Sequence, residues 1–301
     1  MNMIRFTIYT YLFKPINEPQ EPDMFSPEVK VEDSLAMKQK LLGDLFLADS
    51  KLRFSRSRNN GNGEGKQFEH LVVAQREGII VMRLANSTQQ VHEKDFNRWT
   101  EEDNPSLYVL IDNRKDKQII AIENRPQAFS ETGTVAHIME ETFNRRLWSK
   151  RLQVQINAKY RTREFWDVVS EYEQGIASVT FKFPYPNLPE ISDMVGEYYT
   201  ELARRTNTEP KTTITAPPKE KAILQQGDLI LESMIKAASA SGKVIMMRPK
   251  GARKWRKIGL ETIVQEELSD QALKGLEQQE IIAHKWQAIV DFLDRILTVY
   301  T

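Results

Sequence analysis

The chain has 301 residues, equal numbers of basic and acidic side chains, no cysteine, and 40% hydrophobic residues. The lack of cysteine excludes disulfides, thiolate zinc sites, iron–sulfur clusters and thiol catalysis. The composition is that of an ordinary folded protein, and the zero net charge argues against a protein that coats nucleic acid with its whole surface, so any polyanion site must be local.

The first 13 residues alternate between apolar and polar side chains, without the continuous apolar block or small-residue cleavage site of a signal peptide. We therefore predict a first strand at residues 4–13. No window reaches the roughly 18 uninterrupted apolar residues that a membrane helix requires. These features predict a cytoplasmic protein without direct membrane insertion, so a membrane role would require a partner protein.

The rest of the first half predicts a strand-rich lobe. Repeated proline between residues 15 and 27 indicates an extended loop. Residues 59–66, rich in Asn and Gly, predict a hairpin tip, because they lack the Lys-Ser or Lys-Thr pair of a phosphate-binding loop. In chain order the other expected elements are a helix from Asp33 or Ser34, strands at 52–57, 68–75 and 79–84, a polar segment carrying Trp99, strands at 107–111 and 118–123, and a helix from Ser130 to Leu147.

The second half predicts a mixed lobe. In chain order we expect a strand at 152–156, a helix at 162–174, a strand at 177–183, a helix ending near Arg205, a strand at 212–215, a helix at 229–240, strands at 243–247 and 255–260, and a helix at 269–300. Apolar residues of the last helix, including Trp286, are expected in the core, with a docking surface as the alternative. The predicted fold class is α+β: a strand-rich lobe over residues 1–150, closed by a helix, and a mixed α/β lobe over 151–301 with a basic turn and a C-terminal helix.

Two segments concentrate positive charge. Residues 142–163 and 242–257 each contain seven Lys or Arg residues and no acid. Such clusters bind several phosphates at once and release condensed counterions. A tryptophan among them, such as Trp255, can stack on an unpaired base, although a tryptophan in a predicted strand or helix is more often part of the core. The alternative is a solvated basic face balanced by the acids that follow residue 260. The candidate nucleic-acid-binding residues are Arg145, Arg146, Lys150, Arg151, Arg248, Lys250, Arg253, Lys254, Trp255, Arg256 and Lys257.

Two carboxylates suggest a metal-dependent nuclease as an alternative. Asp112 ends one predicted strand and Glu123 ends its hairpin partner, vaguely like the D…E-x-K core of endonucleases, with Arg125 in place of the lysine. Carboxylates at the ends of paired strands can share Mg²⁺ or Mn²⁺, although such residues are commonly just solvated. In the leading interpretation there is no catalytic residue and no cofactor.

His137 and Glu141 lie four residues apart on the predicted helix ending at Leu147, which predicts a surface ion pair rather than a metal site. The chain has no G-x-S-x-G motif, dinucleotide fingerprint or kinase signature. Binding is therefore the favoured class of function.

Residues 165–188, which read FWDVVSEYEQGIASVTFKFPYPNL, resemble a family of bacterial proteins associated with phage-defence gene neighbourhoods. The order of a strand-rich lobe, a helix and a basic lobe is also similar in layout to the Rex exclusion protein A of phage lambda and, more loosely, to the KwaB component of Kiwa defence. These resemblances imply a homodimer that binds DNA in phage resistance together with a protein partner, and they carry over no catalytic residue.

The sequence thus predicts a homodimeric protein that binds nucleic acid, with DNA favoured over RNA, without sequence specificity and as a sensor or effector in anti-phage defence. The first alternative is a metal-dependent nuclease using Asp112 and Glu123. The second is a non-catalytic interaction or scaffold protein whose basic segments pair with its own acids.

Overall fold

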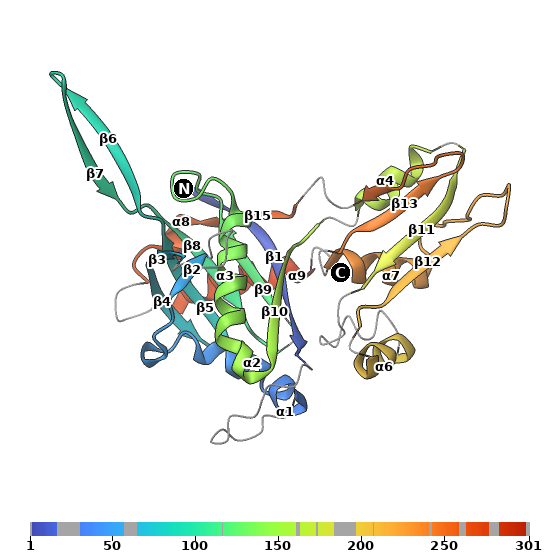
Figure 1. Ribbon diagram of the computed structural model, residues 1–301, viewed down its shortest axis with the longest axis horizontal. Coiled ribbons are helices and arrows are strands. Elements are labelled where there is room, and N and C mark those ends of the chain that lie inside the picture. The colour runs from blue at the N-terminus through green and yellow to red at the C-terminus, as the bar shows by residue number, and fades with distance from the viewer. Residues whose placement is uncertain are drawn as a thin grey trace.

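The computed structural model describes residues 2–16, 31–56, 65–115, 117–160, 163–172, 174–183, 197–206, 208–240, 243–258, 263–276 and 283–298 (Figure 1). Over these residues the protein has a mixed α+β structure with antiparallel sheets and a C-terminal helix, so the predicted fold class is confirmed. Within that part of the chain no helix is long and apolar enough to cross a membrane.

Seven antiparallel strands form the large sheet, in the order β10-β1-β9-β8-β5-β4, with β15 also paired to β1. Because β1 has 13 residues, both β15 and β10 fit along one of its edges, β15 beside its first half and β10 beside its second half. The strands are β1 Met3–Pro15, β4 His70–Arg76, β5 Ile79–Ala85, β8 Ser106–Asp112, β9 Ile119–Glu123, β10 Leu152–Ala158 and β15 Gln265–Ser269.

Two helices cover the two faces of the large sheet. Every residue of β1 from position 6 to 13 is buried, as expected for a strand that is packed on both faces. Tyr9, Tyr11 and Phe13 share a cluster with α3 (Thr132–Leu147), and Phe6 and Ile8 share another with α9 (Ala283–Thr298). Figure 1 shows α3 lying across the strands.

The C-terminal region contains two helices, α8 (Asp270–Leu273) and α9, where one helix over 269–300 was expected. The break has a local cause, because Gly275 has a φ of 77° and ends the first helix. Trp286 and Ile289 of α9 are buried against the large sheet, which confirms the predicted core role of Trp286.

Four antiparallel strands form the small sheet, in the order β12-β11-β13-β14. Its core joins aromatic residues of α4 and β11 to aliphatic residues of α7, and it also contains Leu12 of β1, so the two sheets pack together. The elements are α4 Arg163–Ser170, β11 Ile176–Lys182, α6 Glu197–Thr206, β12 Lys211–Thr215, α7 Leu229–Ala240, β13 Ile245–Pro249 and β14 Arg256–Ile258.

Two hairpins, two short α-helices and two 3₁₀ helices, Ala48–Ser50 and Trp148–Lys150, complete the described structure. The hairpin of β2 (Phe54–Arg56) and β3 (Lys66–Phe68) packs on α3, and the short helices are α1 (Val31–Ala36) and α2 (Lys38–Asp44). The predicted hairpin tip at 59–66 falls mostly on residues 57–64, which lie outside the described residues. Lys66 itself belongs to β3.

The hairpin of β6 (Thr88–Lys94) and β7 (Asn97–Asp103) replaces the polar segment expected around Trp99, and Figure 1 shows it extending from the large sheet. It carries no alternating apolar pattern, which is why the sequence did not predict it. Phe96 at its tip is 98% exposed.

The two sheets divide the chain differently from the predicted lobes. β10 and β15 both follow residue 150, yet both pair with β1, and α9 packs on the same sheet. The small sheet is therefore an insertion between β10 and β15 rather than the first part of a separate C-terminal half.

Candidate nucleic-acid interface

The second basic segment forms a hairpin at one edge of the small sheet. We call β13, β14 and the turn at residues 250–255 the basic hairpin; Met247 pairs with Arg256 at its last register position. The turn is held against the chain that follows α4, because the N–H of Lys250 donates to the carbonyl of Gly175 at 3.0 Å. Gly175 has a φ of 85°, and a Cβ there would lie 2.7 Å from the side chain of Lys221, so this position requires glycine.

Trp255 is held by a stacked arginine rather than buried in the core. The guanidinium of Arg248 lies 5.4 Å from the centre of the Trp255 ring, and Arg248 also donates to the Ser178 hydroxyl at 3.1 Å. The indole remains 40% exposed. Trp255 is therefore not a core residue, which was the alternative for this side chain. Part of its ring is available to a ligand.

Arg256 connects the basic hairpin to the end of α4. Its Nη1 donates to the Tyr172 hydroxyl at 2.5 Å and lies 3.4 Å from a carboxylate oxygen of Glu171, and its guanidinium lies 5.8 Å from the centre of the Tyr172 ring. Glu171 therefore lies beside this hairpin, and both partners of the pair are about half exposed. An exposed pair of this kind contributes only about 0.2–1 kcal/mol and can exchange for a phosphate.

Three cations of the basic hairpin are exposed. The side chains of Arg253, Lys254 and Lys257 have no hydrogen-bond or ion-pair partner among the described residues. Lys254 lines an open cleft of about 770 Å³, which we call the aromatic cleft. The cleft lies between the basic hairpin and the α4–β11 connection, and its lining also includes Tyr172, Gln174, Gly175, Lys250, Trp255 and Arg256.

The first basic segment has a different role, because its arginines bind main-chain carbonyls of the protein itself. Arg145 donates to the carbonyl of Ser55 at 3.0 Å, Arg146 donates to the carbonyl of Ser50, and Arg151 lies 3.4 Å from the carbonyl of Ile16. Lys150 is exposed. These contacts join the end of α3 and the residues after it to β2, to the 3₁₀ helix at Ala48–Ser50 and to the end of β1, so the arginines are engaged in holding the fold.

The two sets of candidate residues lie on different elements. The first lies at the end of α3 on the large sheet, and the second lies at an edge of the small sheet. The geometry therefore favours the basic hairpin alone as the interface.

The carboxylates of the nuclease alternative lie at opposite ends of their hairpin. Asp112 pairs with Ile119 at the turn, whereas Glu123 accepts a hydrogen bond from the N–H of Tyr108 at 2.8 Å, four residues farther along β9. At about 3.4 Å per residue this separation is about 14 Å, too far for one metal ion to bind both. The two strands of an antiparallel hairpin run in opposite directions, so their C-terminal residues lie at opposite ends of the hairpin. The hypothesis of a shared metal ion did not take this into account.

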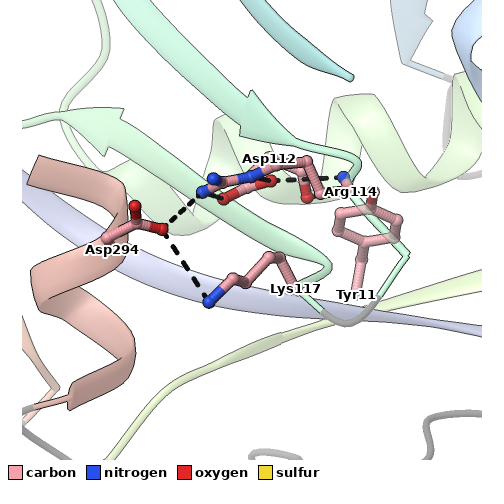
Figure 2. Close-up of polar contacts among 5 residues, drawn as sticks. All are labelled: Tyr11, Asp112, Arg114, Lys117 and Asp294. Carbon is pink, nitrogen blue, oxygen red and sulfur yellow. Dashed lines mark hydrogen bonds and ion pairs between the residues drawn. The ribbon is translucent and has the colours of Figure 1, made fainter. Parts of the chain in front are cut away.

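Asp112 is a buried structural residue (Figure 2). Its carboxylate accepts from Arg114 Nε at 2.9 Å and from Arg114 Nη2 at 2.6 Å, and the same Nη2 donates to Asp294 of α9 at 2.8 Å. The hydrogen bonds to Asp112 raise the pKa of Arg114, so its charge is permanent. Tyr11, whose pKa is raised by burial, donates to Asn113 Oδ1 at 2.7 Å.

Glu123 is also engaged in the fold. Burial raises its pKa, while the N–H of Tyr108 and the charges of Arg125 and Arg83 act in the opposite direction. Among the described residues no group of three His, Asp or Glu side chains is arranged to hold a metal ion. The predicted ion pair of His137 and Glu141 is confirmed, with 3.0 Å between Nε2 and Oε1.

Tyr172, Glu171 and Ser178 contact the basic hairpin and were not predicted as site residues. Tyr172 lies within the helix predicted at 162–174. No signal in the chain links it to Arg256, because the two are 84 residues apart.

No protein-family model matches this chain, and a comparison with curated proteins gives no significant match.

Proposed function

We propose that this protein binds nucleic acid without sequence specificity through the basic hairpin. The observation that carries the proposal is the group formed by Arg253, Lys254 and Lys257, three exposed cations without partners among the described residues, beside a partly exposed tryptophan. Cations that are not engaged by the fold are free to replace the counterions of a phosphate backbone. Trp255 adds a flat apolar surface on which a base can stack.

We further propose that this binding serves phage resistance. Its support is the resemblance of residues 165–188, and that segment includes Glu171, Tyr172 and Gly175, which form one wall of the aromatic cleft. The segment that resembles the phage-defence family thus contributes residues to the candidate interface. DNA is the favoured ligand on the same grounds.

The test replaces Arg253, Lys254 and Lys257 together by Gln and measures binding of a short DNA duplex over a range of salt concentrations. All three side chains are exposed, so the variant should keep the wild-type circular dichroism spectrum and melting temperature. The slope of log K against log salt should become shallower by about 0.9 for every phosphate that the protein no longer neutralises, a total of up to about 2.7 for three cations.

The control has the same change in charge elsewhere. Lys40, Arg76 and Lys115 are exposed on the large sheet and its helices, and their replacement by Gln should leave the slope unchanged. Equal decreases in the two triple variants would mean that only net charge matters. Wild-type protein that does not bind DNA or RNA at low salt would refute the proposal.

Single-strand binding tests the role of the tryptophan. Stacking on one base is worth about 1–3 kcal/mol, so Trp255→Ala should weaken binding of single-stranded DNA more than binding of duplex. Trp148, 48% exposed at the end of α3, supplies the matched control. If Trp148→Ala has the same effect as Trp255→Ala, the aromatic cleft is not the binding site.

A further inference from the structure

The edge of the small sheet opposite the basic hairpin is a strand with one unpaired side. β12 pairs with β11, and no described strand pairs with its other side. The direction of its main-chain groups follows from two hydrogen bonds: the N–H of Phe183 donates to the carbonyl of Pro210, and the N–H of Ala216 donates to the carbonyl of Ala177. Even-numbered residues therefore face β11, because main-chain groups alternate along a strand.

Lys211, Thr213 and Thr215 consequently direct their N–H and C=O groups away from the sheet. Unpaired edges of this type add a further strand readily, and natural proteins usually block them with charge, proline or a covering loop. β12 has only one charged residue, Lys211 at its beginning, and no proline within its span. The described residues of the loop that follows do not cover its outer side with a paired strand.

An apolar groove of about 570 Å³ lies beside this edge, between β12, the loop after it and the start of α7. Ile223 and Ile230, which line it, are 85% and 71% exposed, and the adjacent Leu229 is 84% exposed. Such a concentration of exposed aliphatic side chains is characteristic of an interaction surface.

We infer that two copies of this chain associate edge to edge through β12, around a two-fold axis that passes between their Thr213 residues. In this arrangement each Thr213 exchanges N–H and C=O hydrogen bonds with Thr213 of the second copy, and Lys211 of each copy lies opposite Thr215 of the other. Each outward N–H group of one copy thus finds a C=O group of the second copy, and each outward C=O group finds an N–H group. The same strand contributes from both copies, as in an isologous interface. The inference does not depend on nucleic-acid binding.

Charge and side-chain placement identify a second copy as the occupant of this edge. Lys211 lies at one end of β12, while Glu220, Lys221 and Asp228 line the apolar groove at the other end, next to Thr215, so that the groove lining carries one net negative charge. The two-fold axis brings the end of β12 that carries Lys211 next to that end of the other copy. Because the axis is perpendicular to the sheet, the grooves of both copies lie on the same face, where Ile223 and Ile230 can bury their exposed area across the axis.

The absence of native cysteine allows a direct test by disulfide formation. Residues opposite each other in a hydrogen-bonded antiparallel pair have Cα atoms about 5.5 Å apart, within the roughly 4.4–6.8 Å that a disulfide spans. Thr213→Cys should therefore give a covalent dimer on mild oxidation. Thr215→Cys is the matched control, equally exposed on the same strand, but its two copies would lie about 13 Å apart and should not cross-link.

A mixture of Lys211→Cys and Thr215→Cys proteins should cross-link to each other, which tests the register. Wild-type protein should be a dimer by light scattering, and Ile230→Glu should shift it to monomer, whereas Leu202→Glu on α6 should not. Wild-type protein that is monomeric at micromolar concentration would overturn the inference. Equal cross-linking at positions 213 and 215, or a dimer unaffected by Ile230→Glu, would overturn it as well.

Discussion

The buried carboxylate of Asp112 provides the sharpest test of how the large sheet holds its C-terminal helix. In Asp112→Ala, Arg114 loses three hydrogen bonds to the carboxylate, two from its guanidinium and one from its main-chain N–H, and its guanidinium keeps Asp294, which is 47% exposed. Removing one partner of a buried ion pair typically costs about 3–5 kcal/mol. Because the Arg114 side chain is 27% exposed and retains one partner, we expect the lower end of this range, about 3 kcal/mol.

The comparison with Asp294→Ala provides the internal standard. Asp294 contacts the same arginine from the solvent side, and an exposed pair contributes about 0.2–1 kcal/mol. Urea denaturation of both variants and of Asp112→Asn, which keeps the shape but removes the charge, should therefore rank Asp112→Ala as the least stable and Asp294→Ala as nearly wild type. Equal destabilisation by Asp112→Ala and Asp294→Ala would show that the carboxylate is not a structural anchor.

Two further predictions concern residues that the sequence suggested for catalysis or binding. Because burial raises the pKa of Glu123 above 4.5, the folded state binds its proton more tightly than the unfolded chain, so wild-type stability should fall as pH rises through the window just above 4.5. Glu123→Gln should remove this dependence of stability on pH, as measured by denaturation at acidic and neutral pH. An unchanged pH dependence in the variant would refute the assignment of the effect to Glu123. Arg145→Ala should lower the free energy of unfolding by about 1 kcal/mol, because it removes the hydrogen bonds to Ser55, without changing the salt slope of DNA binding. A weaker slope with unchanged stability would assign Arg145 to the interface instead.

The periodicity of apolar residues was sufficient to predict those helices and strands whose pattern and end signals lie within their own residues. The helix at 229–240 has the predicted bounds, and the strands predicted at 107–111 and 118–123 form and pair as a hairpin. In both cases the apolar pattern and the residues that end the element lie within a short window. The β6–β7 hairpin was missed because its residues carry no alternating apolar pattern that would reveal it.

Long-range pairing could not be predicted in this way. The pairing of β15 with β1 joins residues more than 250 positions apart, and the alternating pattern of each strand is compatible with many partners. The same limit explains the first basic segment: its composition indicates phosphate binding, but only the fold reveals that Arg145, Arg146 and Arg151 bind carbonyl groups. Charge patterns identify candidate residues and not their partners.

The two edges of the small sheet differ in a way that bears on both proposals. Arg256 and Lys257 lie on β14, and positive charge on an edge strand is itself a common means of preventing edge-to-edge association. Protection of that edge would explain these two residues but not Arg253 and Lys254, which lie in the turn beyond the strand. The turn cations therefore favour a ligand. Repulsion between two copies at β14 also leaves β12 as the edge at which the small sheet can extend, so association through β12 would keep both basic hairpins exposed, one at each outer edge of the joined sheet.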